Sequence, residues 1–124
     1  MAARIRLKHA SEEPAPDDGA RVLVDRRWPE DLPREDADLT LWLHSAAPSE
    51  ELRDWYGGDP DRREEYLRRY RTELEDRQEE LNRLEQLGRA ARLTLVHAAA
   101  GGEASHAAVV KELLEERLED GDGG

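Results

Sequence analysis

One run of consecutive apolar residues, in the segment RVLVD (21–25), constrains the fold of this 124-residue chain more than any other feature. A strand that is apolar at consecutive positions is covered on both faces, as the strands of parallel sheets are. A second segment, RLTLVHAA (92–99), also predicts a strand. A third segment, RIRLK (4–8), alternates apolar and basic residues, which is typical of a half-exposed strand.

Helical patterns separate these expected strands, over residues 49–57, 59–88 and 105–119. Strands that alternate with helices favour an α/β fold. We therefore predict α/β: a small single domain with a largely parallel sheet flanked by helices, one of them long and charged. The domain is expected to span residues 1–119, followed by a disordered tail at 120–124.

Two connecting segments are less regular. Residues 10–20 (ASEEPAPDDGA) combine Pro, Gly and acids, which predicts a loop with little to bury. Residues 39–43 (LTLWL) alternate three leucines with Thr40 and Trp42, and the pattern fits a strand or a helical turn equally well.

The longest helical pattern covers residues 59–88. Asp59 can cap it, Pro60 suits the first helical position, and Gly88 is expected to end it. Unbroken, this helix would be about 40 Å long, more than the diameter of a small domain, so it either breaks midway or projects. A projecting stripe would favour a homodimer, whereas the simpler interpretation of its charges is a solvated face. The apolar stripe consists of Leu67, Tyr70, Leu74, Leu81, Leu84 and Leu87.

Composition excludes several functions. The net charge of −11, from 30 acidic against 19 basic residues, repels phosphate backbones, so no nucleic-acid partner is expected. The chain has no Cys and no long apolar run, so we expect no thiol chemistry, no membrane contact and a cytoplasmic location. The acid excess with little Lys fits a halophilic host, and a GC-rich genome equally well.

Polar side chains follow the two most apolar strands directly. Asp25, Arg26 and Trp28 follow the first, and His97 closes the second. The carboxyl ends of parallel strands meet at one edge of a sheet, where ligands bind. Ser105 and His106, which begin the last predicted helix, should reach the same edge. The simpler alternative is that Asp25 pairs with an Arg and Trp28 fills the core.

The segment SEELRDWYG (49–57) predicts a short helix capped by Ser49 and stopped by glycine. Arg53 and Trp55 are two positions apart, so they face different sides of that helix. One of them is therefore expected to be committed to the site, to an ion pair or to solvent.

Five segments together resemble the YeaO-like family, catalogued as domain of unknown function 488: RVLVDRRWP, LWLHSAAPSEELRDWYGGDP, RRYRTEL, LTLVHAA and HAAVVKELL. The resemblance spans about residues 4–116 in order, and it implies a single α/β domain of uncharacterised activity. It matches the family at Asp25, Arg26, Trp28, Pro29, Trp42, Pro48, Ser49, Leu52, Arg53, Trp55, Arg69 and Tyr70.

The chain also departs from the family pattern. Glu30 and Asp31 replace Arg-Gly, Gly58 replaces His, Ala104-Ser105 replaces His-Asn, and His44 stands where Lys is common. If the family is enzymatic, these departures imply a shifted specificity or a weakened copy.

Two hypotheses follow. The first is a small-molecule enzyme or binder of an anionic, phosphate- or nucleotide-like ligand, with Asp25 and His97 as candidate acid or base. The second is a non-enzymatic interaction or regulatory module that docks a partner through an exposed stripe on the 59–88 helix. No metal-ligand spacing or nucleophile elbow is present, so no metal is expected, and the sequence identifies no cofactor. The candidate ligand-binding residues are Arg26, Trp28, Ser49, Arg53, Trp55, Arg69, Tyr70, Ser105 and His106.

Overall fold

A parallel sheet forms the centre of the protein. The structure, a computed structural model, describes residues 5–30, 33–98 and 106–122. Strands β1 (Ile5–His9), β2 (Ala20–Leu23), β3 (Leu41–Trp42) and β4 (Leu93–His97) pair in the order β1-β4-β2-β3. Every pairing is parallel, with Leu95 of β4 opposite both Leu7 and Val22. The predicted α/β class is confirmed, and all carboxyl ends of the strands lie at one edge.

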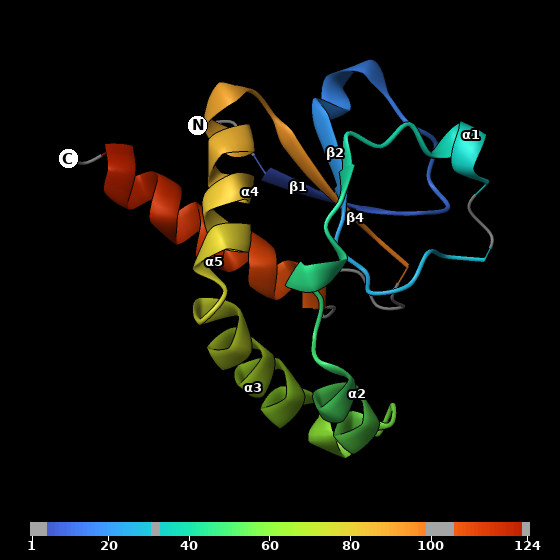
Figure 1. Ribbon diagram of the computed structural model, residues 1–124, viewed down its shortest axis with the longest axis vertical. Coiled ribbons are helices and arrows are strands. Elements are labelled where there is room, and N and C mark those ends of the chain that lie inside the picture. Colours follow the sequence, from blue (N-terminus) through green and yellow to red (C-terminus); the bar gives the residue numbers. More distant parts are fainter. Residues whose placement is uncertain (1–4, 31–32, 99–105, 123–124) are drawn as a thin grey trace.

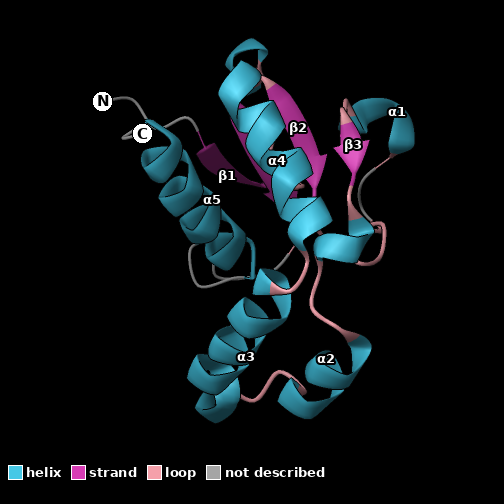
Figure 2. Ribbon diagram, turned by 60° about the vertical axis from the view of Figure 1, so that its left-hand side comes forward, coloured by secondary structure: helices cyan, strands magenta, loops and turns pink. Residues whose placement is uncertain are grey.

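Helices cover the sheet unequally. Helices α4 (Gln78–Ala90) and α5 (His106–Asp122) cross one face, and α1 (Arg34–Ala37) lies beside β3 (Figure 1, Figure 2). Helices α2 (Glu50–Tyr56) and α3 (Arg63–Glu75) extend away from the sheet beyond its carboxyl edge. Short 3-10 turns at Pro16–Asp18, His44–Ala46 and Pro60–Arg62 complete the connections. No helix in the described part of the chain is long and apolar enough to cross a membrane.

Two apolar clusters lie on the two faces of the sheet. Alternate residues of β2 and β4, such as Val22 and Leu95, join the leucines of α3, α4 and α5 in the larger cluster. The residues between them, Leu23 and Val96, join a smaller cluster with Ala37 on the other face. Consecutive residues of β2 and β4 are buried because both faces of these strands are covered, as the apolar run predicted for β2.

The pattern over residues 59–88 breaks midway, which resolves the two alternatives left by the sequence. Helix α3 ends at Glu75 and α4 begins at Gln78. At the break, Arg77 donates to the Ser45 carbonyl at 2.7 Å and also contacts the Ala47 carbonyl. Folding the second half back buries most of the apolar stripe instead of exposing it, with Tyr70, Leu74, Leu81 and Leu84 almost fully buried.

Three predicted boundaries shift. Gly88 does not end its helix, because α4 continues to Ala90, and Gly88 packs beside Leu118 of α5. Helix α5 continues to Asp122, into the segment expected to be a tail. The 39–43 segment contains the short strand β3, and a 3-10 turn follows at residues 44–46.

The 10–20 segment is not the purely exposed loop that we predicted. Its Asp18 is 1% exposed and pairs with Arg21, which is itself 3% exposed, at 2.7 Å. Gly19 follows with a φ of 67°, and an added Cβ there would lie 2.2 Å from the Arg92 carbonyl oxygen. Glycine is therefore required for β2 to approach the start of β4.

Candidate functional site

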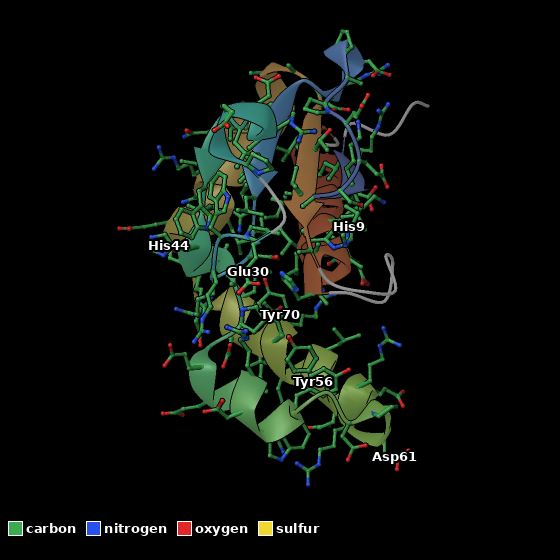
Figure 3. All side chains as sticks on the ribbon, turned by 90° about the vertical axis from the view of Figure 1, so that its right-hand side faces the viewer. His9, Glu30, His44, Tyr56, Asp61 and Tyr70 are labelled. Carbon is green, nitrogen blue, oxygen red and sulfur yellow. The ribbon has the colours of Figure 1, made fainter. Side chains whose placement is uncertain are left out.

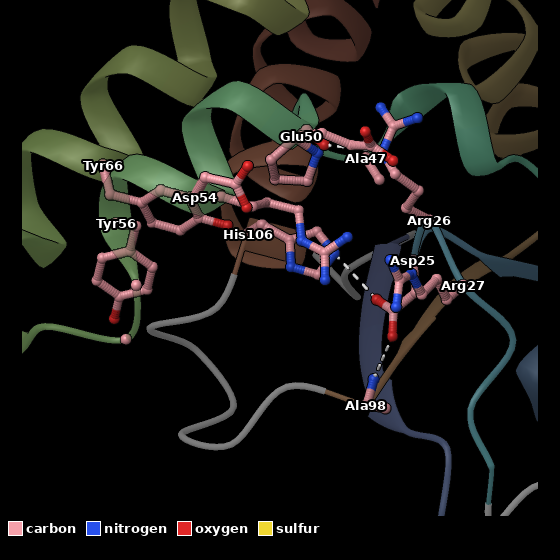
Figure 4. Close-up of a pocket in the computed structure, with 14 residues that line it drawn as sticks. Asp25, Arg26, Arg27, Ala47, Glu50, Asp54, Tyr56, Tyr66, Ala98 and His106 are labelled. Atoms are coloured by element: carbon pink, nitrogen blue, oxygen red, sulfur yellow. Dashed lines mark hydrogen bonds and ion pairs between the residues drawn. The ribbon is translucent and has the colours of Figure 1, made fainter.

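A cleft of about 680 Å³ lies between the carboxyl edge of the sheet and helix α2 (Figure 4). Ligand sites in parallel α/β sheets form at this edge, and the volume is within the usual range for them. The cleft is lined by Asp25, Arg26, Arg27, Ala47, Pro48, Glu50, Arg53, Asp54, Tyr56, Gly57, Gly58, Tyr66, Ala98 and His106.

Asp25, two residues beyond the end of β2, is only partly satisfied. Its Oδ2 accepts a 2.9 Å hydrogen bond from the Ala98 amide. His106 Nε2 lies 3.0 Å from Oδ1, but it is the Val24 carbonyl oxygen, at 3.3 Å, that lies in hydrogen-bonding geometry. Oδ1 is consequently buried near an imidazole without accepting a hydrogen bond from the described residues.

Three arginines of the cleft have no carboxylate partner among the residues that the structure describes. Arg26 and Arg27 come from the segment after β2, and Arg53 from α2. Arg26 donates through Nε to the Pro48 carbonyl at 3.1 Å, which fixes its side chain while satisfying one of its donors. Within the described residues, no carboxylate lies within ion-pair distance of any of these three guanidinium groups.

The arginines share the cleft with three carboxylates, those of Asp25, Glu50 and Asp54. Acidic and basic groups are thus balanced here, whereas the whole chain has 30 acids and 19 bases. Relative to the rest of the molecule, the cleft is enriched in positive charge.

Two tyrosines form an aromatic wall of the cleft. Tyr56 ends α2 and Tyr66 lies in the first turns of α3, and their rings stack with centroids 4.1 Å apart at 12°. Burial raises the pKa of Tyr66 to about 12, so its hydroxyl is neutral at ordinary pH. Figure 4 shows the Tyr66 hydroxyl directed towards His106.

Tyr70 packs beneath the cleft and is not one of the residues that line it. It is fully buried, donates from its hydroxyl to the Ala46 carbonyl at 2.5 Å, and contacts the His106 ring edge-on. In Figure 3 it lies between the sheet and Tyr56. Burial raises its pKa far above the usual range. Tyr70, which we expected among the ligand-binding residues, thus packs in the main core and is not one of the residues that line the cleft.

Trp28, which we expected among the ligand-binding residues, does not line the cleft. Its ring packs edge-on against Trp42, with centroids 5.5 Å apart, beside the smaller apolar cluster. The Trp42 Nε1 in turn donates to the Asp25 carbonyl at 2.8 Å. Trp28, two positions after Arg26, packs against the smaller apolar cluster, as the simpler alternative proposed.

Ser49, Trp55 and Arg69 line a second, smaller cavity of about 440 Å³ between α2 and α3. Ser49 accepts from the Leu52 amide as the predicted cap and donates to Glu73 at 2.5 Å. Arg69 pairs with Glu65 at 2.9 Å and stacks over the Trp55 ring at 4.2 Å. These three residues are therefore separated from the main cleft, and Arg53 and Trp55 do face different cavities.

His97 is buried beneath the cleft and is not among the residues that line it. It is 2% exposed, its Nδ1 has no partner among the described residues, and its ring contacts His9 edge-on. Burial lowers its pKa, which favours the neutral imidazole. Ser105, like Asp31 and Ala104, lies outside the described residues.

Several lining residues were missed by the sequence analysis, although one signal could have found them. Glu50, Arg53, Asp54 and Gly57 recur at the i, i+3, i+4 and i+7 positions that share one face of a helix. Having placed Arg53 at the site, we could have assigned its helical neighbours with it. The described residues contain no group of three or more His, Asp or Glu that could hold a metal ion.

Comparison with known proteins gives two kinds of match. A family model described as the inactive DUF488-N3 subclade matches residues 4–124. The uncharacterized protein Rv3073c of Mycobacterium tuberculosis is 41% identical over 114 residues, covering 92% of this chain and 96% of the relative. The uncharacterized protein YeaO of Escherichia coli K12 is 31% identical over 110 residues, covering 89% and 96%. No solved structure matches.

Proposed function

The chain belongs to the YeaO-like DUF488 family, and we propose that its cleft binds a small anionic molecule without catalysing a reaction on it. The relatives are uncharacterised, so the family supplies no ligand. The proposal rests on the chemistry of the cleft.

The observation that carries the proposal is the set of three unpaired guanidinium groups in one cleft. Most other basic residues of this acidic chain have a carboxylate partner, as Arg21, Arg71 and Arg117 do. A guanidinium group presents a planar fork of donors that matches a phosphate or a carboxylate. Because Pro48 holds Arg26 in place, the remaining donors of Arg26 are oriented before a ligand arrives.

Two observations support binding without catalysis. The matching family model is described as inactive. Gly58, the position at which the family pattern has His, lines the cleft, and a Cβ added there would meet nothing within 4 Å. An imidazole at this position would reach the cleft, so its absence removes a candidate acid or base and leaves space for a ligand.

The interaction-module hypothesis required an exposed apolar stripe over residues 67–87. The break between α3 and α4 instead packs Tyr70, Leu74, Leu81 and Leu84 into the main core. That burial favours the ligand cleft over docking through the long helix.

Thermal unfolding at low ionic strength tests the proposal, with inorganic pyrophosphate, ribose 5-phosphate and adenosine 5′-monophosphate as probes. A ligand that binds only the native state raises the Tm by mass action. We expect at least one probe to raise the Tm of the wild type, and this rise to disappear in Arg53→Gln.

Arg83→Gln is the matched control, since Arg83 is an exposed arginine of α4 outside the cleft and its substitution removes the same charge. It should retain the shift. No shift with any probe in the millimolar range, or equal loss of the shift in both variants, would reject the anion cleft.

A further inference from the structure

The stacked tyrosines at the end of α2 indicate more about the ligand than its charge. We propose that the ligand carries an aromatic ring that stacks on Tyr56 while its anionic group contacts the cleft arginines, as a nucleoside monophosphate would. This inference rests on the proposed anion-binding function and adds the class of the molecule.

The first step concerns which ring surface is open. Tyr66 is 9% exposed and belongs to the main core, whereas Tyr56 is partly exposed and packs against that core from outside. In a parallel pair, each ring covers one face of the other. The aromatic surface that the pair leaves open to the cleft is therefore mainly that of Tyr56.

The second step compares Tyr56 with the other aromatic rings. Trp28 and Trp42 cover each other, Trp55 lies under Arg69, and Tyr70 is fully buried. Within the described residues, no ring other than Tyr66 and no cation stacks on Tyr56. In a chain with three Trp, three Tyr and no Phe, a partly exposed ring in the wall of a cleft is a notable surface to leave uncovered.

The third step concerns the space beside this ring. Gly57 and Gly58 follow Tyr56 with φ angles of 55° and 76°, and both line the cleft. The left-handed turn carries no side chain over Tyr56, and a Cβ at Gly58 would have no neighbour within 4 Å. A planar group can therefore approach the tyrosine without displacing protein atoms at Gly58.

The fourth step relates the ring to the charges. Tyr56, Arg53 and Arg27 line the same cleft of about 680 Å³, which has room for a base, a sugar and a phosphate. Stacking between a base and an aromatic side chain depends on the π-face and little on the identity of the base. Tyr56 would thus select for an aromatic ring, and the arginines for the attached anion.

Calorimetric titration with two probes tests the inference. Adenosine 5′-monophosphate and ribose 5-phosphate share the phosphate and the sugar, and only the first carries a base. The wild type should bind the nucleotide about 5- to 100-fold more tightly, as expected for one stacked base. Tyr56→Phe should keep this preference, and Tyr56→Leu should reduce it to near one while leaving the affinity for ribose 5-phosphate unchanged.

The outcomes separate this inference from the function on which it rests. Equal affinity for the two probes in the wild type, with binding lost in Arg53→Gln, would overturn the aromatic ligand and leave the anion site standing. A preference that survives in a folded Tyr56→Leu would overturn the role of Tyr56. Binding of neither probe would overturn the nucleotide-like ligand, and the anion site would then stand only if pyrophosphate still raises the Tm of the wild type. If Tyr56→Leu does not fold, the ratio of the wild-type affinities for the two probes decides the inference by itself.

Discussion

Asp18 and Asp25 lie at opposite ends of the same strand, and their surroundings differ completely. Asp18, just before β2, accepts hydrogen bonds from the Ala15 amide, from Lys8 Nζ and from Arg21 Nη1. Asp25, just after β2, accepts one from the Ala98 amide, and its Oδ1 has none among the described residues. The Asp18 carboxylate thus accepts several hydrogen bonds from the protein, whereas Oδ1 of Asp25 accepts none from the described residues.

The arginines show the same difference. Arg21 is 3% exposed and uses its donors on Asp18 and on the Ala37 and Asp38 carbonyls. Arg53 is exposed and has no carboxylate partner in the described part of the chain. Buried polar groups that stabilise a fold are satisfied within it, whereas groups that await a ligand keep free donors and acceptors. The polar groups at the amino edge of the sheet are thus satisfied within the fold, whereas several at the carboxyl edge lack partners among the described residues.

The same substitution at the two aspartates should have unequal effects on stability. Asp18→Asn leaves a buried Arg21 without a counter-charge, which should lower the free energy of unfolding by about 3–5 kcal/mol. Asp25→Asn keeps an oxygen for the Ala98 amide and should cost about 1 kcal/mol. Urea unfolding at pH 7 measures both. An equal loss of unfolding free energy in the two variants, or a larger loss in Asp25→Asn, would contradict the distinction between the two ends of β2.

Acid should lower the free energy of unfolding in two different pH ranges, one set by Asp18 and the other by His97. The effect of His97, at the cleft end of the sheet, should be the smaller. Burial raises the pKa of Asp18, but hydrogen bonds from Ala15, Lys8 and Arg21 outweigh it and lower the pKa to about 2. The stabilisation from Asp18 is therefore complete above about pH 4 and is lost as the pH falls towards 2.

His97 affects the stability of the protein at higher pH than Asp18 does. Burial, the largest cause, lowers the pKa of His97 from 6.5; His106 and, less strongly, His9 lower it further, while Asp25 and Glu12 act in the opposite direction. Because the unfolded state binds the proton more readily, stability is complete above pH 6.5 and decreases as the pH falls below it. The free energy of unfolding at pH 7.5 and 5.5, measured by urea, should decrease less in His97→Gln than in the wild type. An unchanged decrease would mean that other groups carry the pH dependence.

The smallest effect is expected at the cleft arginines. Arg27 is exposed and has no ion pair in the described part of the chain, so Arg27→Gln should change the free energy of unfolding by less than about 0.5 kcal/mol. Urea unfolding without added ligand checks this value. A loss above 1 kcal/mol would make Arg27 a structural residue like Arg21.

The sequence predicted the sheet well because burial leaves a direct pattern. Consecutive apolar residues in 21–25 identified a strand with both faces covered, and the segment 92–99 was identified as a further strand. Ser49 and Asp59 cap as their residue types indicate. The break at residues 76–77 was only one of two alternatives. It depends on Arg77 reaching carbonyls 32 and 30 positions earlier, which no local pattern records.

The candidate site was predicted in part. Asp25, Arg26, Arg53 and His106 do line the cleft, because the carboxyl ends of parallel strands must meet. Trp28 and Trp55 were misplaced because a ring close to the site in sequence can turn to either side of its strand or helix. The burial of Asp18 was missed because its partners Lys8 and Thr94 come from two other strands.

The strand order has a consequence for how the protein is made. Among the described strands, β4 comes last along the chain but lies between β1 and β2, so β1 and β2 are not neighbours in the sheet. Among the described strands, β1 pairs only with β4, so β1 stays unpaired until β4 has been translated and is free to fold. A fragment that ends before Leu93 would leave β1 as an unpaired strand edge, which favours non-native pairing.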